Sequence, residues 1–188
     1  MQPKIIARET VYAGYLSIDR LKLRLADGAT VWREVERHGD AAVVLPYDVQ
    51  RRCALLVRLF RAPVFDACGE ISVEEACAGM IEDEDAEGAA RREATEEMGV
   101  VLGAIELVGR VWSSPGVSTE RQSLFLATYE AADRRSDGGG VVGEHEGIAV
   151  IERPLAQLAA AVDQRRIADG KLMTLVLALR LLRPELFA

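Results

Sequence analysis

The stretch that decides the fold begins with Ala78-Gly79-Met80-Ile81-Glu82-Asp83-Glu84 and resumes, after residues 85–91, with Arg92-Glu93-Ala94-Thr95-Glu96-Glu97-Met98-Gly99-Val100. Glu93 and Glu97 are four residues apart, so on an α-helix their carboxylates share one face. Like charges on one face repel each other, and a helix that accepts them usually gains from a bound divalent cation. Gly99 follows where helices commonly end in a left-handed residue. The stretch therefore predicts a helix with a cation site near its carboxyl end.

Segments on both sides of this helix have the patterns of strands and helices. Leucines at 21, 23 and 25 alternate with basic residues, and Asp27-Gly28 marks a turn, so a hairpin is expected there. Residues 67–71 are predicted to form a loop. The predicted strands are 21–25, 31–37, 41–45, 54–59, 73–77, 105–112, 124–129 and 148–151, and the predicted helices are 85–98, 154–164 and 171–182. This mixture favours an α+β or mixed-sheet sandwich over a regular βαβ repeat.

Composition narrows the class of protein. The chain has 188 residues, 49% of them hydrophobic, which suits one packed domain. Its net charge of −7 argues against a non-specific binder of nucleic acid or of an anionic membrane. The 3 cysteines lack a CxxC spacing, so reduced thiols in a cytoplasmic protein are expected, without a disulfide framework or a zinc site. The sequence suggests neither a signal peptide nor a membrane-spanning helix.

From Glu84 to Val100 the residues resemble the signature of the Nudix hydrolases. That signature is a glycine, a glutamate, then after seven residues Arg-Glu, an aliphatic residue, a Glu-Glu pair, a glycine and an aliphatic residue. The chain matches it with Glu84, Arg92-Glu93, Ala94, Glu96-Glu97, Gly99 and Val100. Gly79 departs from the pattern, because four residues separate it from Glu84 where the family has five. The resemblance implies a Nudix α/β/α sandwich with a mixed β-sheet and an N-terminal antiparallel β arm.

The resemblance also implies a metal-dependent active site. Glu93 and Glu97 would bind Mg²⁺, with Mn²⁺ able to substitute, assisted by the backbone carbonyl of Ala78. Glu96 would lie behind these ligands or join them, and Arg92 would orient the glutamates. Hydrolysis of a diphosphate needs charge neutralised, a water deprotonated and a leaving phosphate stabilised. Magnesium held by carboxylates can do all three.

Shorter motifs surround this signature: Arg33-Glu34-Val35, Leu59-Phe60-Arg61, Glu75-Ala76-Cys77-Ala78-Gly79, Ser114-Pro115-Gly116, Thr119-Glu120, the triplet at Gly138 and Asp169-Gly170-Lys171. In this order they resemble the GDP-mannose hydrolase branch of the ADP-sugar pyrophosphatase group. That resemblance implies substrate contacts from Tyr15, Arg33, Glu34, Arg61, Ala78, Gly79, Glu97, Glu120 and Lys171. An acid on the loop after the triplet would complete the metal site or act as the base. Glu146 fits this position better, and Glu144 is the alternative.

These motifs predict hydrolysis of a nucleoside diphosphate sugar, with GDP-mannose giving GMP and mannose 1-phosphate. Two alternatives stay open: an ADP-ribose pyrophosphatase, which would give AMP and ribose 5-phosphate, and a catalytically weak module that binds nucleotide sugars. Without the family context, the acidic helix is a solvated face, Tyr15 and Arg61 are packing or surface residues, and Asp169-Gly170-Lys171 is a turn. The predicted organisation is a β arm at residues 1–40, which would build a homodimer, and a Nudix hydrolase domain at 41–188.

Overall fold

A computed structural model describes residues 2–140 and 147–187 of the chain. It divides into two compact units, Met1–Ala41 with Arg110–Gln122, and Ala42–Gly109 with Ser123–Ala188. Within the described residues, no helix is both long and apolar enough to cross a membrane. The proposed boundary between arm and domain at residues 40 and 41 stays a prediction, as does the role of the arm in a dimer.

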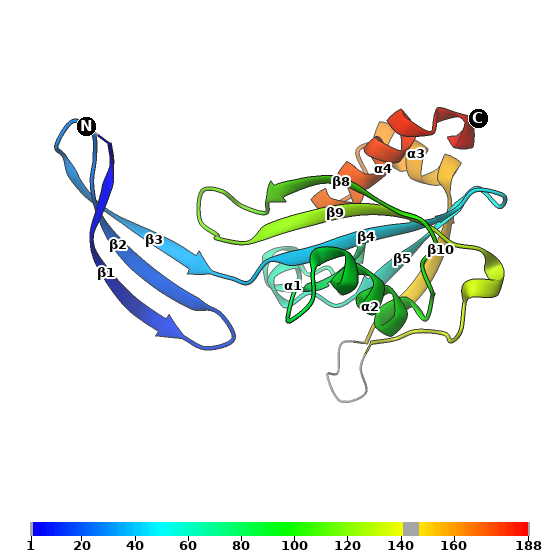
Figure 1. The fold of residues 1–188 in the computed structure, drawn as a ribbon, viewed down its shortest axis with the longest axis horizontal. Coiled ribbons are helices and arrows are strands. Elements are labelled where there is room, and N and C mark those ends of the chain that lie inside the picture. The colour runs from blue at the N-terminus through cyan, green and yellow to red at the C-terminus, as the bar shows by residue number, and fades with distance from the viewer. Residues whose placement is uncertain (1, 141–146, 188) are drawn as a thin grey trace. The chain divides into compact units, whose positions relative to one another are not determined.

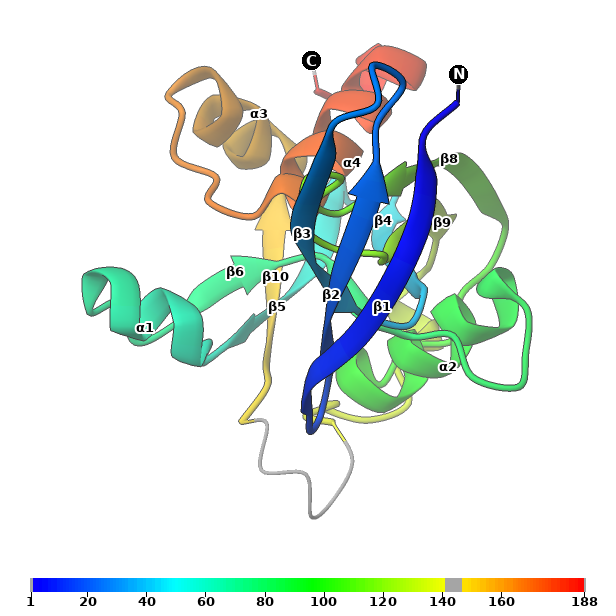
Figure 2. The same cartoon turned by 90° about the vertical axis from the view of Figure 1, so that its left-hand side faces the viewer.

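The first unit is built on an antiparallel sheet of β1 (Lys4–Ala13), β2 (Ser17–Arg24) and β3 (Thr30–Arg37), side by side in that order (Figure 2). The predicted hairpin is confirmed, since β2 and β3 flank a turn in which Gly28 has a φ of 89°. The sequence does not predict β1. Every residue of this strand is exposed, so its side chains lack the alternation that burial on one face imposes.

A buried carboxylate on β2 ties the three strands of this sheet together. Asp19 accepts hydrogen bonds from Arg8 Nη1 at 2.9 Å, Thr10 Oγ1 at 2.8 Å and Arg37 Nε at 2.9 Å. The hydrogen bonds from Thr10 and Arg37 lower the pKa of Asp19 below its ordinary value. Because β1 buries little apolar surface, these charge-assisted hydrogen bonds help to hold it against β2.

The second unit contains most of a larger mixed sheet (Figure 1). Its order is β10 (Ala149–Pro154), β5 (Cys53–Leu59), β4 (Ala41–Asp48), β9 (Arg121–Thr128) and β8 (Ile105–Trp112). Strands β4 and β5 pair beside their connection, at Tyr47 with Ala54 and Asp48 with Cys53. Further along, β6 (Val73–Glu75) pairs with β5 and β7 (Cys77–Met80) pairs with β4. These two short strands lead the chain towards the acidic helix.

Helices cover both faces of this sheet, with α2 (Ala86–Met98) on one side and α3 (Leu155–Asp163) and α4 (Gly170–Leu182) on the other (Figure 1). Alternate residues of β4 serve the two faces, because Val44 packs in the cluster of α2 and Val43 in the cluster of α3 and α4. All eight residues of β4 are therefore buried, as expected of a strand covered on both sides. Each fully buried Val or Leu contributes about 1.5–3 kcal/mol. The predicted α/β/α sandwich is confirmed.

Other differences from the sequence prediction are local. The predicted loop at 67–71 is partly wrong, because α1 (Ala62–Cys68) extends into it. No residue of α1 from Ala62 to Cys68 is buried, so the helix leaves no periodic pattern in the sequence. The strand predicted at 73–77 is two strands interrupted at Ala76, and β9 begins at Arg121 rather than at 124.

Candidate active site

Helix α2 carries the predicted glutamates on its last two turns. Asp85 caps its start by accepting a 2.8 Å hydrogen bond from Gly88 N, and Gly99 ends it with a φ of 64°. Ala90, Ala94 and Met98 turn into the core, so the acidic residues between them lie on the other sides of the helix. The predicted helix and its left-handed cap are confirmed.

Arg92 forms hydrogen bonds with three carboxylates on or next to this helix. Its Nη1 donates to Glu93 Oε1 at 2.7 Å and to Glu96 Oε2 at 3.0 Å. Its Nη2 donates to Glu84 Oε1 and to the carbonyl of Met80, both at 3.0 Å. Glu84 thus reaches Arg92 despite the shortened loop. One guanidinium orders the loop and two helical carboxylates, a task that suits its forked donors.

Gly79 on β7 leaves room for the Glu93 carboxylate. A Cβ built on Gly79 would lie 1.8 Å from Glu93 Oε1 and 1.9 Å from Glu93 Cδ, far inside van der Waals contact. The backbone of β7 therefore approaches the glutamate closely, and a side chain at residue 79 would require the Glu93 carboxylate to move. The glycine of the signature has a steric reason here.

Cys77 brings the second glutamate to the same strand. Cys77 and Gly79 are two residues apart, so they lie on one face of β7. The Cys77 thiol is fully buried in the cluster of α2, and burial together with the nearby Glu97 and Glu93 carboxylates raises its pKa well above the ordinary value. Glu97 is itself only 7% exposed. Both glutamates thus face β7, which places carboxylates and the backbone of residues 77–80 next to one another.

A second charged cluster is centred on Glu75, at the end of β6. Arg61 binds it through two bonds, Nε to Oε1 at 2.7 Å and Nη2 to Oε2 at 3.2 Å. Lys171 Nζ reaches the same Oε2 at 3.1 Å and Asp169 Oδ1 at 2.8 Å. Burial alone would raise the pKa of Glu75, but the bond from Arg61 and the charge of Lys171 outweigh it and lower that pKa. Two predicted substrate contacts, Arg61 and Lys171, are therefore brought together.

The remaining predicted contacts lie elsewhere in the chain. Tyr15, Arg33, Glu34 and Glu120 belong to the first unit, and Tyr15 is 86% exposed. Arg33 pairs with Leu21 and Glu34 with Arg20, so these neighbours point to opposite faces of β3. The loop acids Glu144 and Glu146 lie outside the described residues. Their roles stay predictions.

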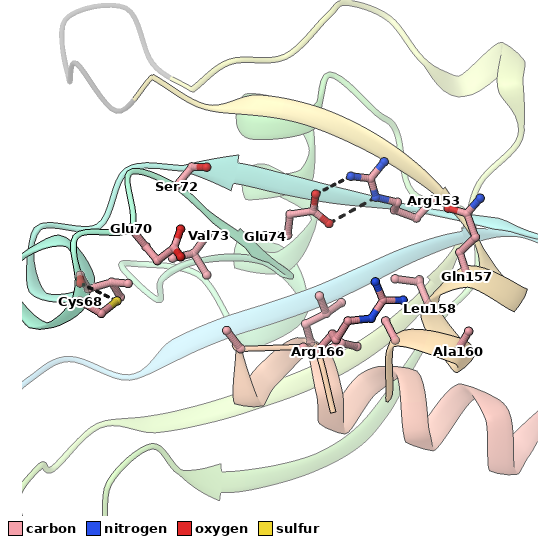
Figure 3. Close-up of a pocket in the computed structure, with 15 residues that line it drawn as sticks. Cys68, Glu70, Ser72, Val73, Glu74, Arg153, Gln157, Leu158, Ala160 and Arg166 are labelled. Carbon is pink, nitrogen blue, oxygen red and sulfur yellow. Dashed lines mark hydrogen bonds and ion pairs between the residues drawn. The ribbon is translucent and has the colours of Figure 1, made fainter. Parts of the chain in front are cut away.

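The described residues that line the cavity in Figure 3 include none of the charged residues of the two clusters. It has a volume of about 640 Å³ and lies among α1, β6, β10, α3 and the segment that leads into α4. Glu74 and Arg153 face each other in it as an ion pair. Among the described residues that line it, none is a predicted site residue.

Glu75, Cys77 and Asp169 belong to motifs noted in the sequence, but no role was predicted for any of the three. Asp169 caps α4 by accepting from the backbone amides of Lys171 and Leu172, and it also accepts from Ala76 N at 3.2 Å. Such contacts join segments more than 90 residues apart in the sequence. The hydropathy pattern contains no signal for them.

Comparison with known proteins identifies the family. Residues 37–174 match the model of the NUDIX domain, which covers most of the chain. The chain belongs to the Nudix family. It is 39% identical over 145 residues to the GDP-mannose pyrophosphatase of Pectobacterium atrosepticum, which covers 77% of this chain and 74% of that protein. It is 38% identical over 150 residues to the GDP-mannose pyrophosphatase of Cronobacter sakazakii, covering 79% and 78%.

A solved structure supports the Nudix fold over the whole chain. The crystal structure of an ADP compounds hydrolase superposes with a TM-score of 0.81, at 18% sequence identity, and covers 100% of this chain and 98% of its own. The resemblance stated from the signature is confirmed at the level of family and fold.

Nudix hydrolases generally use divalent metal ions, and the carboxylates of α2 suit one. Glutamate and carbonyl oxygens are hard ligands of the kind that Mg²⁺ or Mn²⁺ prefers. Within the described residues, no group of three or more His, Cys, Asp and Glu side chains is assembled as a metal site. Glu93 and Glu96 instead bind Arg92. A metal would therefore draw on two helical carboxylates together with the backbone of β7.

Proposed function

We propose that this Nudix protein hydrolyses the diphosphate bond of a nucleoside diphosphate sugar, with Mg²⁺ as its metal and Mn²⁺ able to substitute. GDP-mannose and water would give GMP and mannose 1-phosphate. The observation that carries the proposal is the ordered set of carboxylates around Arg92, pressed against Gly79. The choice of GDP-mannose rests on relatives of that name, which are 34–39% identical to this chain.

In this proposal Glu93, Glu97 and the Ala78 carbonyl hold the metal. When bound, the ion supplies charge neutralisation for the diphosphate and lowers the pKa of a bound water. Arg92 keeps Glu93 and Glu96 in place through its Nη1 bonds, so these side chains need little reorganisation. Glu146 is the proposed loop acid, with Glu144 as the alternative.

The substrate would be held mainly by cations. Arg61 and Lys171 both form ion pairs with Glu75, and both side chains are suited to binding phosphate oxygens. Ala78, Gly79 and Glu97 would line the diphosphate, whereas Tyr15, Arg33, Glu34 and Glu120 would contact the nucleoside and sugar ends.

A second candidate substrate is ADP-ribose, with AMP and ribose 5-phosphate as products. It is favoured by the fold neighbour, whose name is ADP compounds hydrolase. Purified protein with Mg²⁺ should be incubated with GDP-mannose and with ADP-ribose, and the products separated by chromatography. Faster turnover of GDP-mannose supports the main proposal, and a strong preference for ADP-ribose selects the second. Absence of turnover of both, by folded protein, would leave a weak binding module.

We also propose that the protein is a cytoplasmic homodimer that associates through the N-terminal strands. All ten residues of β1 are exposed, among them Ile5 at 55% and Tyr12 at 55%. Apolar side chains displayed by a strand favour association with a second chain. Light scattering coupled to size-exclusion chromatography should give twice the chain mass, and Ile5→Lys with Tyr12→Lys should reduce it. A monomeric wild-type chain would contradict the proposal.

A further inference from the structure

We propose that Glu75 is a positioning residue that holds Arg61 and Lys171 together as one clamp for a diphosphate. This inference rests on the proposed function, because it assigns the anion-binding half of that same site. Three elements meet at this carboxylate: the end of β5, which leads to Arg61, the end of β6, and the first turn of α4.

The two cations share one oxygen of Glu75. Arg61 Nη2 and Lys171 Nζ lie 3.2 Å and 3.1 Å from Oε2, so they are no further apart than the sum of those two contacts. Unscreened cations at such a distance repel each other strongly. The carboxylate between them removes this cost and leaves two cationic groups close enough to contact one diphosphate.

Asp169 fixes the Lys171 side of the clamp. Its Oδ1 accepts from Lys171 Nζ at 2.8 Å, and its Oδ2 accepts from Ala76 N at 3.2 Å and Leu172 N at 3.1 Å. The same carboxylate thus starts α4 and ties it to the break between β6 and β7. Because the chain continues directly into β7, only Ala76 and Cys77 separate Glu75 from Ala78, a proposed metal ligand.

Both carboxylates of the clamp are buried. Glu75 is 5% exposed and Asp169 is 9% exposed, so neither carboxylate can exchange its partners for water without exposing the cluster. Burial lowers the pKa of Lys171, but the charges of Asp169 and Glu75 outweigh it and raise that pKa, so the ammonium stays charged. Ion pairs with this degree of burial define position more than exposed pairs do.

The direction in which Glu75→Gln changes anion affinity distinguishes a positioning role from a purely electrostatic one. Glu75→Gln removes one negative charge beside the anion site, so Coulomb's law alone predicts tighter anion binding. Positioning predicts the opposite, because the amide no longer holds both cations. Glu75→Asp keeps the charge but shortens the reach, so it too should weaken binding only if geometry matters.

The probe is inorganic pyrophosphate, titrated calorimetrically into the full chain in EDTA, so that the proposed metal ligands take no part. Wild type should bind it, and both Glu75 variants should bind about 10-fold more weakly or worse, as expected from losing hydrogen bonds to charged groups. With Mg²⁺ and GDP-mannose, KM should rise by a similar factor while kcat changes little.

Glu74→Gln is the matched control, since Glu74 is the neighbouring glutamate and binds Arg153 in the cavity of Figure 3. It should behave as wild type in both assays. In a Lys171→Met background the effect of Glu75→Gln should shrink, because the residue through which it acts is absent. Circular dichroism checks that each variant is folded.

Tighter or unchanged pyrophosphate binding by folded Glu75→Gln would overturn the positioning role. If the losses of pyrophosphate affinity in Glu75→Gln and Lys171→Met are fully additive, the positioning role is also overturned. If the wild type does not bind pyrophosphate, the clamp itself is overturned. If pyrophosphate binding follows the expected pattern but neither GDP-mannose nor ADP-ribose is hydrolysed, the proposed function is contradicted and the clamp is still supported.

Discussion

Replacing Gly79 by alanine adds one methyl group, and this change should reduce activity strongly while lowering stability only slightly. The new Cβ would lie 1.8 Å from Glu93 Oε1. Since ordinary contact begins near 3.4 Å, the carboxylate must move by about 1.5 Å or more. The φ of Gly79 is not in the left-handed region, so the backbone itself tolerates alanine.

The cost in stability should be small. The displaced Glu93 would give up its 2.7 Å bond to Arg92, whose side chain is 30% exposed and keeps Glu84 and Glu96 as partners. Partly exposed pairs of this kind contribute about 0.2–1 kcal/mol. A loss of about 1 kcal/mol lowers the Tm of a protein of this size by about 2–4 °C.

The cost in activity should be large, because displacement of a catalytic group by about 1 Å can cost about 100-fold. We expect kcat/KM for GDP-mannose to fall by about 100-fold or more and the Mg²⁺ concentration for half-maximal rate to rise. Steady-state kinetics across Mg²⁺ concentrations and thermal unfolding measure the two effects. Gly109→Ala is the control, since its Cβ would meet no atom of the described chain within 4 Å. Full activity of Gly79→Ala would refute the assignment of Glu93.

Three further predictions concern Glu97, Arg92 and Asp19. Glu97→Gln should cut turnover by about 100-fold or more, while the free energy of unfolding changes little or rises by about a few tenths of a kcal/mol, as measured by kinetics and urea titration. Arg92→Lys should lower turnover by about 10-fold or more, because one ammonium cannot replace the forked bonds to Glu93 and Glu96; normal kinetics would contradict this. The pKa of Asp19 is lowered in the folded chain, so its stabilisation is present above the ordinary value of 3.8 and lost as the pH falls through the folded value. Proteolysis of β1 should therefore increase below about pH 4 in wild type, whereas Asp19→Asn should be cleaved readily at all pH values.

The sequence by itself determined the features that depend on local spacing. Glu93 and Glu97 at four-residue spacing, alanines at the same spacing and Gly99 at the end predict α2 and its acidic side, because helical geometry relates residues three and four apart. The mostly apolar runs at 41–45 and 54–59 predict β4 and β5 in the same way, since strands buried on both faces consist largely of apolar residues. The family signature adds the chemistry of these residues.

Only the tertiary structure decided which distant residues meet. Glu75 and Lys171 are 96 positions apart and form one ion pair, and the Glu93 carboxylate occupies the space that a side chain at residue 79 would fill. The physical reason is that sequence periodicity records which side of an element faces the core, whereas contacts between elements depend on how those elements pack.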